Sequence, residues 1–194
     1  MKTNIALLLS CLSATSLAAA PEEIRQWLES HNAYRAMHGA APLVWSQALA
    51  ASAQSFADSC PSGHSTTSYG ENLAWISSFK PAERVVKFWY DEEPLYNYKS
   101  PGYSFETGHF TQLVWKGTQE IGCGYAKGCV TRLPNVWVCH YSPAGNYSGQ
   151  FAENVLPKGA DNKGGAGDNG SRNPSPWRTE GGREGDAWPM PSFH

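Results

Sequence analysis

The chain lacks the features expected of a nucleic-acid-binding or membrane-embedded protein. Its 15 Lys and Arg residues nearly balance 17 Asp and Glu residues, with no basic run, so nucleic acid is not expected as a partner. Beyond residue 20 no stretch approaches the roughly 18 consecutive apolar residues of a membrane-spanning helix. HExxH, GxSxG and paired CxxC motifs are also missing. We therefore expect a protein that does not span a membrane and is not an enzyme.

Residues 1–19 are predicted to form a cleavable signal peptide. Lys2 gives a positive start, apolar runs follow at 5–9 and 12–17, and three alanines occupy 18–20. The apolar part is too short to cross a bilayer but is typical of an export signal. Cleavage after Ala18 or Ala19 is favoured, because Pro21 would follow a cut after Ala20. The mature chain is thus expected to be secreted and extracellular.

Four cysteines remain once Cys11 leaves with the signal peptide. An even number in an exported chain indicates disulfides, and four cysteines allow three pairings. Segments 121–126 and 136–141 are predicted to form a hairpin with its centre near Thr131. That register sets Cys123 opposite Cys139, which leaves Cys129 to reach Cys60. A zinc site formed by these cysteines is disfavoured because paired CxxC spacing is missing.

Several segments have the spacing of amphipathic helices. They are residues 21–39, a helix capped by Ser46, a helix opened by Pro81, and a short helix from His109 to Trp115. The buried face of the second is predicted to be Leu49, Ala53, Phe56 and Cys60. The third runs toward Tyr96, with Pro94 ending or bending it. Because the predicted strands come late and pair as a hairpin, the expected class is α+β with a small antiparallel sheet.

The segment 159–194 differs in composition from the rest. It contains eight Gly and four Pro but no Leu, Ile or Val. Such a segment buries too little apolar surface to offset its ordering entropy, so a disordered tail is predicted. Two N-glycosylation sequons begin at Asn146 and Asn169, and the second, in the tail, is the expected acceptor.

Four separated motifs carry a resemblance to a known family. They are His31-Asn32 with Arg35, Tyr69–Ala74, Gly108–Trp115 and Val136–Tyr147. Over about residues 24–155, and in this order, they resemble the CAP superfamily of cysteine-rich secretory proteins, antigen 5 and pathogenesis-related class 1 proteins. The resemblance implies a CAP domain over 20–158, folded as an α-β-α sandwich. It also supports the disulfide pairings Cys60–Cys129 and Cys123–Cys139.

The family's central cleft is lined by two histidines and two acidic residues. Matched motif by motif, they are His64, Glu71, Glu92 and His109. Helical periodicity alone does not separate Glu92 from Glu93. Such a set could hold a divalent metal such as zinc, act as a general acid and base, or form only a hydrogen-bonded cluster. No cofactor is required in this interpretation, and His31, His38 and His140 are assigned structural positions.

An aromatic segment follows the third predicted helix. Tyr96, Tyr98 and Tyr103 have the spacing called the caveolin-binding motif, and Phe105 follows closely. Here the chain resembles yeast secreted CAP proteins, in which this loop binds sterol. Flat aromatic faces with hydroxyl groups suit a rigid amphipathic lipid. These four residues are therefore the predicted lipid-binding residues.

Three functions follow from these features. The preferred hypothesis is a secreted carrier that exports or sequesters sterols, with fatty acids as a second lipid class. The alternatives are a metal-dependent hydrolase or protease that uses the His/Glu cleft, and a secreted effector or defence protein without catalysis. Loss of sterol binding without Tyr103 would support the first, and chelator-sensitive turnover the second.

Overall fold

A computed structural model describes residues 20–130 and 133–160 of the chain. Its α-helices and strands are α1 (Pro21–Met37), β1 (Val44–Trp45), α2 (Gln47–Asp58), β2 (Gly70–Ile76), α3 (Ala82–Tyr90), α4 (Gly108–Val114), β3 (Glu120–Ala126), β4 (Asn135–Ser142) and α5 (Phe151–Asn154). Two short 3-10 helices, Glu93–Leu95 and Phe105–Thr107, flank the predicted lipid loop.

The strands form one sheet in the order β1-β3-β4-β2. β4 pairs antiparallel with β3 and with β2, which makes β2 an edge strand. The two-residue β1 adds a parallel pair beside β3, so the sheet is not wholly antiparallel. The hairpin of β3 and β4 confirms the prediction, whereas β1 and β2 were not predicted.

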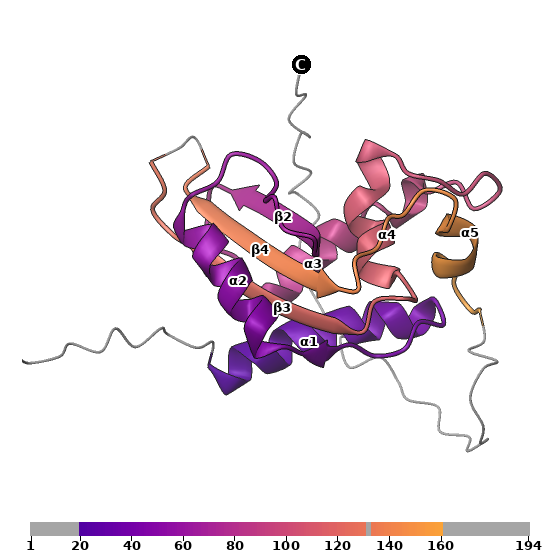
Figure 1. The fold of residues 1–194 in the computed structure, drawn as a ribbon, viewed down its shortest axis with the longest axis horizontal. Helices are drawn as coiled ribbons and strands as arrows, with labels where there is room; N and C mark the ends of the chain where they lie inside the picture. The colour runs from indigo at the N-terminus through magenta and orange to yellow at the C-terminus, as the bar shows by residue number, and fades with distance from the viewer. Residues whose placement is uncertain (1–19, 131–132, 161–194) are drawn as a thin grey trace, which may run out of the picture. The chain divides into compact units, whose positions relative to one another are not determined.

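Helices cover both faces of this sheet (Figure 1). α2 lies across β3 and β4 on one face, whereas α1, α3 and α4 pack together on the other. α2 reaches the sheet because β3 presents Gly122 and Gly124, where a side chain would collide with the helix backbone. The described residues thus have the α-β-α layering and the α+β class expected from the sequence.

Both predicted disulfides are present. Cys123 is the register partner of Cys139 across the hairpin, and their sulfur atoms are bonded. Cys60 is bonded to Cys129 over a sequence separation of 69 residues. The second bridge ties the end of α2 to the loop after β3, which anchors that helix on its face of the sheet.

A buried arginine connects the helical layer to the loops around it. The Arg35 side chain is fully buried. Its guanidinium donates to the carbonyl oxygens of Ala41, Leu113, Trp115 and Thr118 at 2.8–3.0 Å. Burial lowers its pKa to about 10. One side chain therefore satisfies carbonyl groups at the end of α4 that the helix itself leaves unpaired.

Two expectations about the helices require correction. The third helix ends at Tyr90, before Pro94, and does not run on toward Tyr96. The buried face of α2 consists of Leu49, Ala50, Ala53 and Ala57. Phe56 and Cys60 are only half-buried, because the close approach to β3 leaves room for small side chains only at the centre of the contact.

Some predictions concern residues outside the described part of the chain. The signal peptide over 1–19, Asn169 and nearly all of the predicted tail fall there. The described chain still packs at its end, because the Gly159 N–H donates to the Met37 carbonyl oxygen at 2.9 Å. Among the described helices, none is long and apolar enough to cross a membrane.

Candidate functional site

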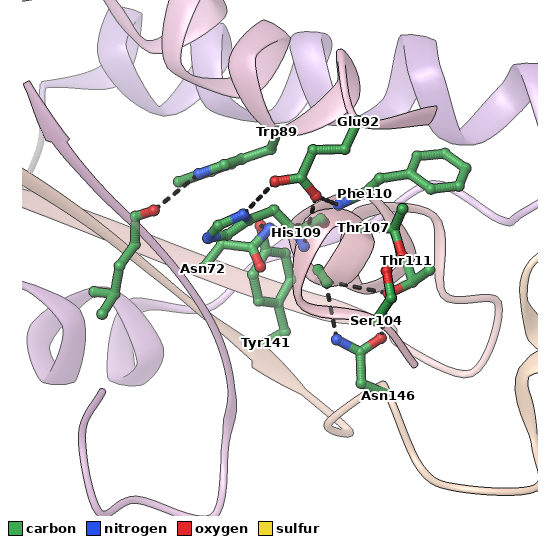
Figure 2. A network of polar contacts seen from close by, with 12 residues as sticks. Asn72, Trp89, Glu92, Ser104, Thr107, His109, Phe110, Thr111, Tyr141 and Asn146 are labelled. Carbon is green, nitrogen blue, oxygen red and sulfur yellow. Dashed lines mark hydrogen bonds and ion pairs between the residues drawn. The ribbon is translucent and has the colours of Figure 1, made fainter. Parts of the chain in front are cut away.

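The first His–Glu pair joins the segment that follows α3 to the start of α4 (Figure 2). Glu92 is 7 % exposed. Its Oε1 accepts from His109 Nδ1 at 2.5 Å, and its Oε2 accepts from the His109 and Phe110 backbone N–H groups, each at 3.0 Å. The carboxylate satisfies N–H groups that the first turn of a helix leaves free. Glu92 therefore fixes both the imidazole and the backbone of His109.

A second set of contacts holds the surroundings of His109 (Figure 2). The Trp89 ring stacks on the imidazole with centroids 6.3 Å apart. Trp89 Nε1 donates to the Leu73 carbonyl oxygen at 3.1 Å, and Asn72 Nδ2 donates to the His109 carbonyl oxygen at 3.1 Å. These contacts attach α3 and α4 to the edge strand β2.

The second His–Glu pair lies on β2 and the loop before it. Glu71 Oε1 accepts from His64 Nδ1 at 2.6 Å and from the Ser65 N–H at 3.0 Å. Its Oε2 accepts from His140 Nε2 at 2.9 Å. Burial opposes the charge of Glu71, but the hydrogen bonds from His140, His64 and Ser65 outweigh it and hold the pKa of this carboxyl well below its usual range. Glu71 is therefore an ionised carboxylate whose two oxygens both accept hydrogen bonds.

His140 takes a place in this network that the sequence did not suggest. Its imidazole is fully buried and lies between Glu71 and α2. Because the Nε2–H group of His140 donates to the Glu71 carboxylate, Nδ1 carries no proton and can accept a hydrogen bond. It accepts from the Ser52 hydroxyl at 3.1 Å. Ser52 lies in no motif, so no pattern could have marked it. The sequence assigned His140 a structural position, and the structure adds this link.

The two pairs contact different layers of the fold. Glu71 and Asn72 are consecutive on β2, so their side chains face opposite sides of the sheet. Glu71 connects through His140 to Ser52 on α2, whereas Asn72 contacts His109 on α4. The four predicted residues are thus joined two by two, His64 to Glu71 and His109 to Glu92.

These contacts also test how well a zinc ion would fit. Both carboxylates bind a histidine Nδ1, which is how outer-shell carboxylates orient zinc-binding imidazoles. Nε2 of His64 and of His109 has no hydrogen-bond partner among the described residues. A catalytic zinc usually has three protein ligands. Within 20–130 and 133–160, however, no group of three or more His, Cys, Asp or Glu side chains could hold a metal. Zinc binding thus stays a prediction, and the only ligand atoms these contacts leave for it among the four residues are Nε2 of His64 and Nε2 of His109.

The predicted lipid-binding residues divide into two kinds. Tyr96 is buried and packs against Phe110, with ring centroids 5.7 Å apart. Tyr98 is half-buried, and its hydroxyl donates to Glu93 Oε1 at 3.0 Å. Tyr103 and Phe105 are instead 62 % and 71 % exposed. Within this loop the first two rings are anchors, and the last two are presented to solvent.

The sequon residue Asn146 is part of the structure around α4 (Figure 2). Its Nδ2 donates to the Gly108 carbonyl oxygen at 2.9 Å, and its Oδ1 accepts from Thr111 Oγ1 at 2.7 Å. A glycan attached at Nδ2 would have to fit beside the Gly108 carbonyl group, where this nitrogen is already engaged. Asn146 is therefore better placed to hold the loop after β4 against α4 than to carry a sugar.

Comparison with known proteins identifies the family. Residues 28–141 match the model of the cysteine-rich secretory protein family, CAP. The chain is 44 % identical over 135 residues to Protein PRY2 of Saccharomyces cerevisiae, covering 67 % of this chain and 40 % of that protein. It is 40 % identical over 140 residues to the human Golgi-associated plant pathogenesis-related protein 1, covering 67 % and 90 %. The chain belongs to the CAP family.

Solved structures agree with this assignment. BmVAL-1 is similar with a TM-score of 0.61 at 26 % identity, over 72 % of this chain and 85 % of that one. NaASP2, solved with Zn2+, has a TM-score of 0.60 at 23 % identity, over 74 % and 90 %. At that identity the second likeness supports the fold alone. The chain also spans only about two fifths of the yeast relative, so that protein's activity does not transfer directly.

Proposed function

We propose that this CAP protein is a secreted carrier that binds sterol through the exposed end of its aromatic loop. The single observation that carries the proposal is the exposure of Tyr103 and Phe105. Apolar side chains exposed beside one another mark interaction sites, whereas singly scattered ones are common, and Tyr103 and Phe105 are only two residues apart in the chain. The resemblance to yeast secreted CAP proteins over this loop gives the lipid class.

The Tyr103 and Phe105 rings are held in place by the start of α4 and the 3-10 helix before it. A side chain at Gly108 would contact the Tyr103 ring at 3.2 Å, so this ring lies directly against the start of α4. Phe105 begins the 3-10 helix that leads into α4. One side of Tyr103 is therefore packed, while the rest of the ring is open to a flat ligand.

The opposite end of the loop is held by Glu93, the neighbour of Glu92. Glu93 accepts from the Tyr98 hydroxyl and, at 2.7 Å, from Lys158 Nζ. Tyr98 meets Tyr96 edge to face with centroids 4.9 Å apart. The base of the loop is thus ordered before any ligand arrives, which lowers the entropy lost on binding.

The test is equilibrium binding of a fluorescent sterol to the secreted protein and to its Tyr103→Ala/Phe105→Ala variant. Wild type should bind with micromolar or tighter affinity, about −8 kcal/mol. Covering an aromatic side chain contributes about 1.5–3 kcal/mol. Loss of both rings should therefore weaken binding at least tenfold while the thermal midpoint stays unchanged.

Phe79→Ala is the matched control, because Phe79 is also an exposed aromatic residue, 46 % exposed, outside the loop. It should leave sterol binding unchanged. Tyr96→Ala is a poor test, because Tyr96 belongs to the core and its loss would destabilise the fold. Unaltered sterol affinity in the double variant would disprove the proposed site.

A further inference from the structure

A polar groove lies between α2 and the loop that precedes β2. It has a volume of about 350 Å³ and is lined by Ser52, Ser55, Phe56, Ser59, Ser65, Thr66 and Thr67. The lining contains six hydroxyl groups and one aromatic ring but no charged side chain. It is separate from the aromatic loop, so the groove is independent of the proposed sterol site.

The Ser52 hydroxyl differs from the other hydroxyls of this groove because its hydrogen-bond partner is an imidazole. The Ser52 hydroxyl donates to His140 Nδ1 at 3.1 Å, and His140 Nε2 donates to Glu71 Oε2 at 2.9 Å. Ser59 instead donates to the Phe56 carbonyl oxygen, and Ser65 is paired with Thr67 at 2.9 Å. Within the described residues, Ser52 is the one hydroxyl of the lining bonded to an imidazole.

The hydrogen-bonded chain Ser52–His140–Glu71 contains the groups that activate a serine nucleophile: a hydroxyl, an imidazole and a carboxylate. A hydroxyl becomes nucleophilic when an imidazole can accept its proton, and a carboxylate on the other ring nitrogen fixes the imidazole's tautomer and orientation. Glu71 is itself held by His64 and the Ser65 N–H. Here Nδ1 faces the serine and Nε2 the carboxylate, and either nitrogen can accept a proton.

We propose that Ser52 is a nucleophile that accepts an acyl group from a small neutral ester bound in this groove. Ser52 Oγ attacks the ester carbonyl carbon as its proton passes to His140 Nδ1. The ester C–O bond then breaks, and the alcohol leaves with that proton. Water, deprotonated by His140, cleaves the acyl–serine ester and regenerates the hydroxyl.

The groove suits such a substrate by its chemistry. Its uncharged lining carries no group to attract an ionic ligand, and Phe56 offers an apolar surface to an acyl chain. The Ser65 and Thr67 hydroxyls line the same groove and bond to each other, so one of the two keeps its proton for the oxygen that becomes negative during attack. No sequence motif indicates this site, because Ser52, Glu71 and His140 come from three separate elements.

The experiment is covalent labelling of the intact secreted protein with a fluorophosphonate probe, followed by peptide mass spectrometry. In this reaction Ser52 Oγ bonds to phosphorus, fluoride leaves, and the serine proton passes to His140. One adduct per chain is expected, on Ser52. Ser52→Ala should lose labelling at least 100-fold, and His140→Gln at least tenfold. Hydrolysis of p-nitrophenyl acetate should fall in parallel.

Ser55→Ala is the matched control, because Ser55 lies on α2 and lines the same groove without bonding an imidazole. It should label at the wild-type rate. Circular dichroism checks that each variant is folded, and if His140→Gln does not fold, Ser52→Ala and Ser55→Ala still decide the question. Labelling that is absent from Ser52, or equal on Ser52 and Ser55, would overturn the proposal and leave the Ser52 hydroxyl only a hydrogen-bond partner.

Discussion

Two adjacent glutamates show how closely residue identity and position determine role in this domain. Glu92 is buried and holds the first turn of α4, whereas Glu93 holds Tyr98 and Lys158 at the base of the aromatic loop. Helical spacing predicted neither role, since both residues lie beyond the end of α3 at Tyr90. The family motif selected Glu92, and the contacts show why one position cannot replace the other.

The first prediction concerns Glu92. Glu92→Ala removes the acceptor for three N–H donors, two of them on the backbone of α4. We expect a loss of about 2–4 kcal/mol in unfolding free energy, because hydrogen bonds to a charged group are worth about 1.5–3 kcal/mol and buried donors stay unpaired. Urea denaturation followed by Trp fluorescence measures the loss.

Glu93→Ala is the comparison for this prediction. The Lys158 side chain is 48 % exposed, so its ion pair with Glu93 should contribute about 1 kcal/mol or less. The hydrogen bond from the Tyr98 hydroxyl should add about 1 kcal/mol, so the loss should be smaller than for Glu92→Ala. Equal stabilities of the two variants would contradict the assigned role of Glu92.

At the scale of elements, the contact between α2 and β3 determines the layering. A Cβ atom added at Gly124 would lie 2.5 Å from the Gln54 Cα atom of α2. A Cβ atom added at Gly122 would collide in the same way with the backbone of Leu49 and Ala50. The helix therefore packs directly on the strand backbone. This contact also brings Ser52 within reach of His140 on β4.

The second prediction concerns this contact. Gly122→Ala forces α2 away from β3, and overpacking of this kind costs about 1–3 kcal/mol or more. Gly63→Ala is the control, because nothing lies within 4 Å of a Cβ there, and it should change stability by less than about 0.5 kcal/mol. Thermal unfolding of the two variants provides the measurement, and similar midpoints would show that α2 can move without cost.

β2 is the longest of the elements that the sequence did not predict. A strand is recognised by alternation of buried and exposed side chains when one face is solvated. β2 instead has Glu71 and Leu73 toward α2 and Asn72 toward α4, so its exposure does not alternate. Its polar residues are buried in the two networks, which removes the signal that would have marked a strand.

At the scale of the whole molecule, buried histidines make stability depend on pH. His31 Nδ1 donates to the Trp27 carbonyl oxygen, and Nε2 accepts from the Tyr141 hydroxyl, so the ring is neutral. Burial lowers the pKa of His31 to about 3 and also lowers the pKa of His38. Both groups bind protons more weakly in the folded than in the unfolded chain.

The third prediction follows from the sign of these shifts. The unfolded histidines titrate near 6.5, so their contribution to stability is complete above that pH. It is lost as pH falls from 6.5 toward 3 for His31, by about 1.4 kcal/mol per pH unit for each such group. Below about 4.5 the lowered pKa of Glu71 adds a further loss. Urea unfolding between pH 7.5 and 4.5 measures this slope.

His31→Gln isolates the histidine contribution. Whatever its absolute stability, its unfolding free energy should vary less steeply with pH between 6.5 and 4.5 than that of wild type. Identical slopes would show that His31 is not the source of the acid sensitivity.

The sequence by itself determined the family through four motifs, and it predicted the β-hairpin with its Cys123–Cys139 bridge because the local spacing of two strands sets that register. It also predicted α1 to α4 from their helical spacing, though not the end of α3, and the Cys60–Cys129 bridge as the pairing that remained. It also named the aromatic loop and the His and Glu residues. Only the tertiary structure decided which rings face solvent, which glutamate binds which histidine, and that Ser52 meets His140. Those relations join residues from α2, β2, β4 and α4, and packing alone sets such distances.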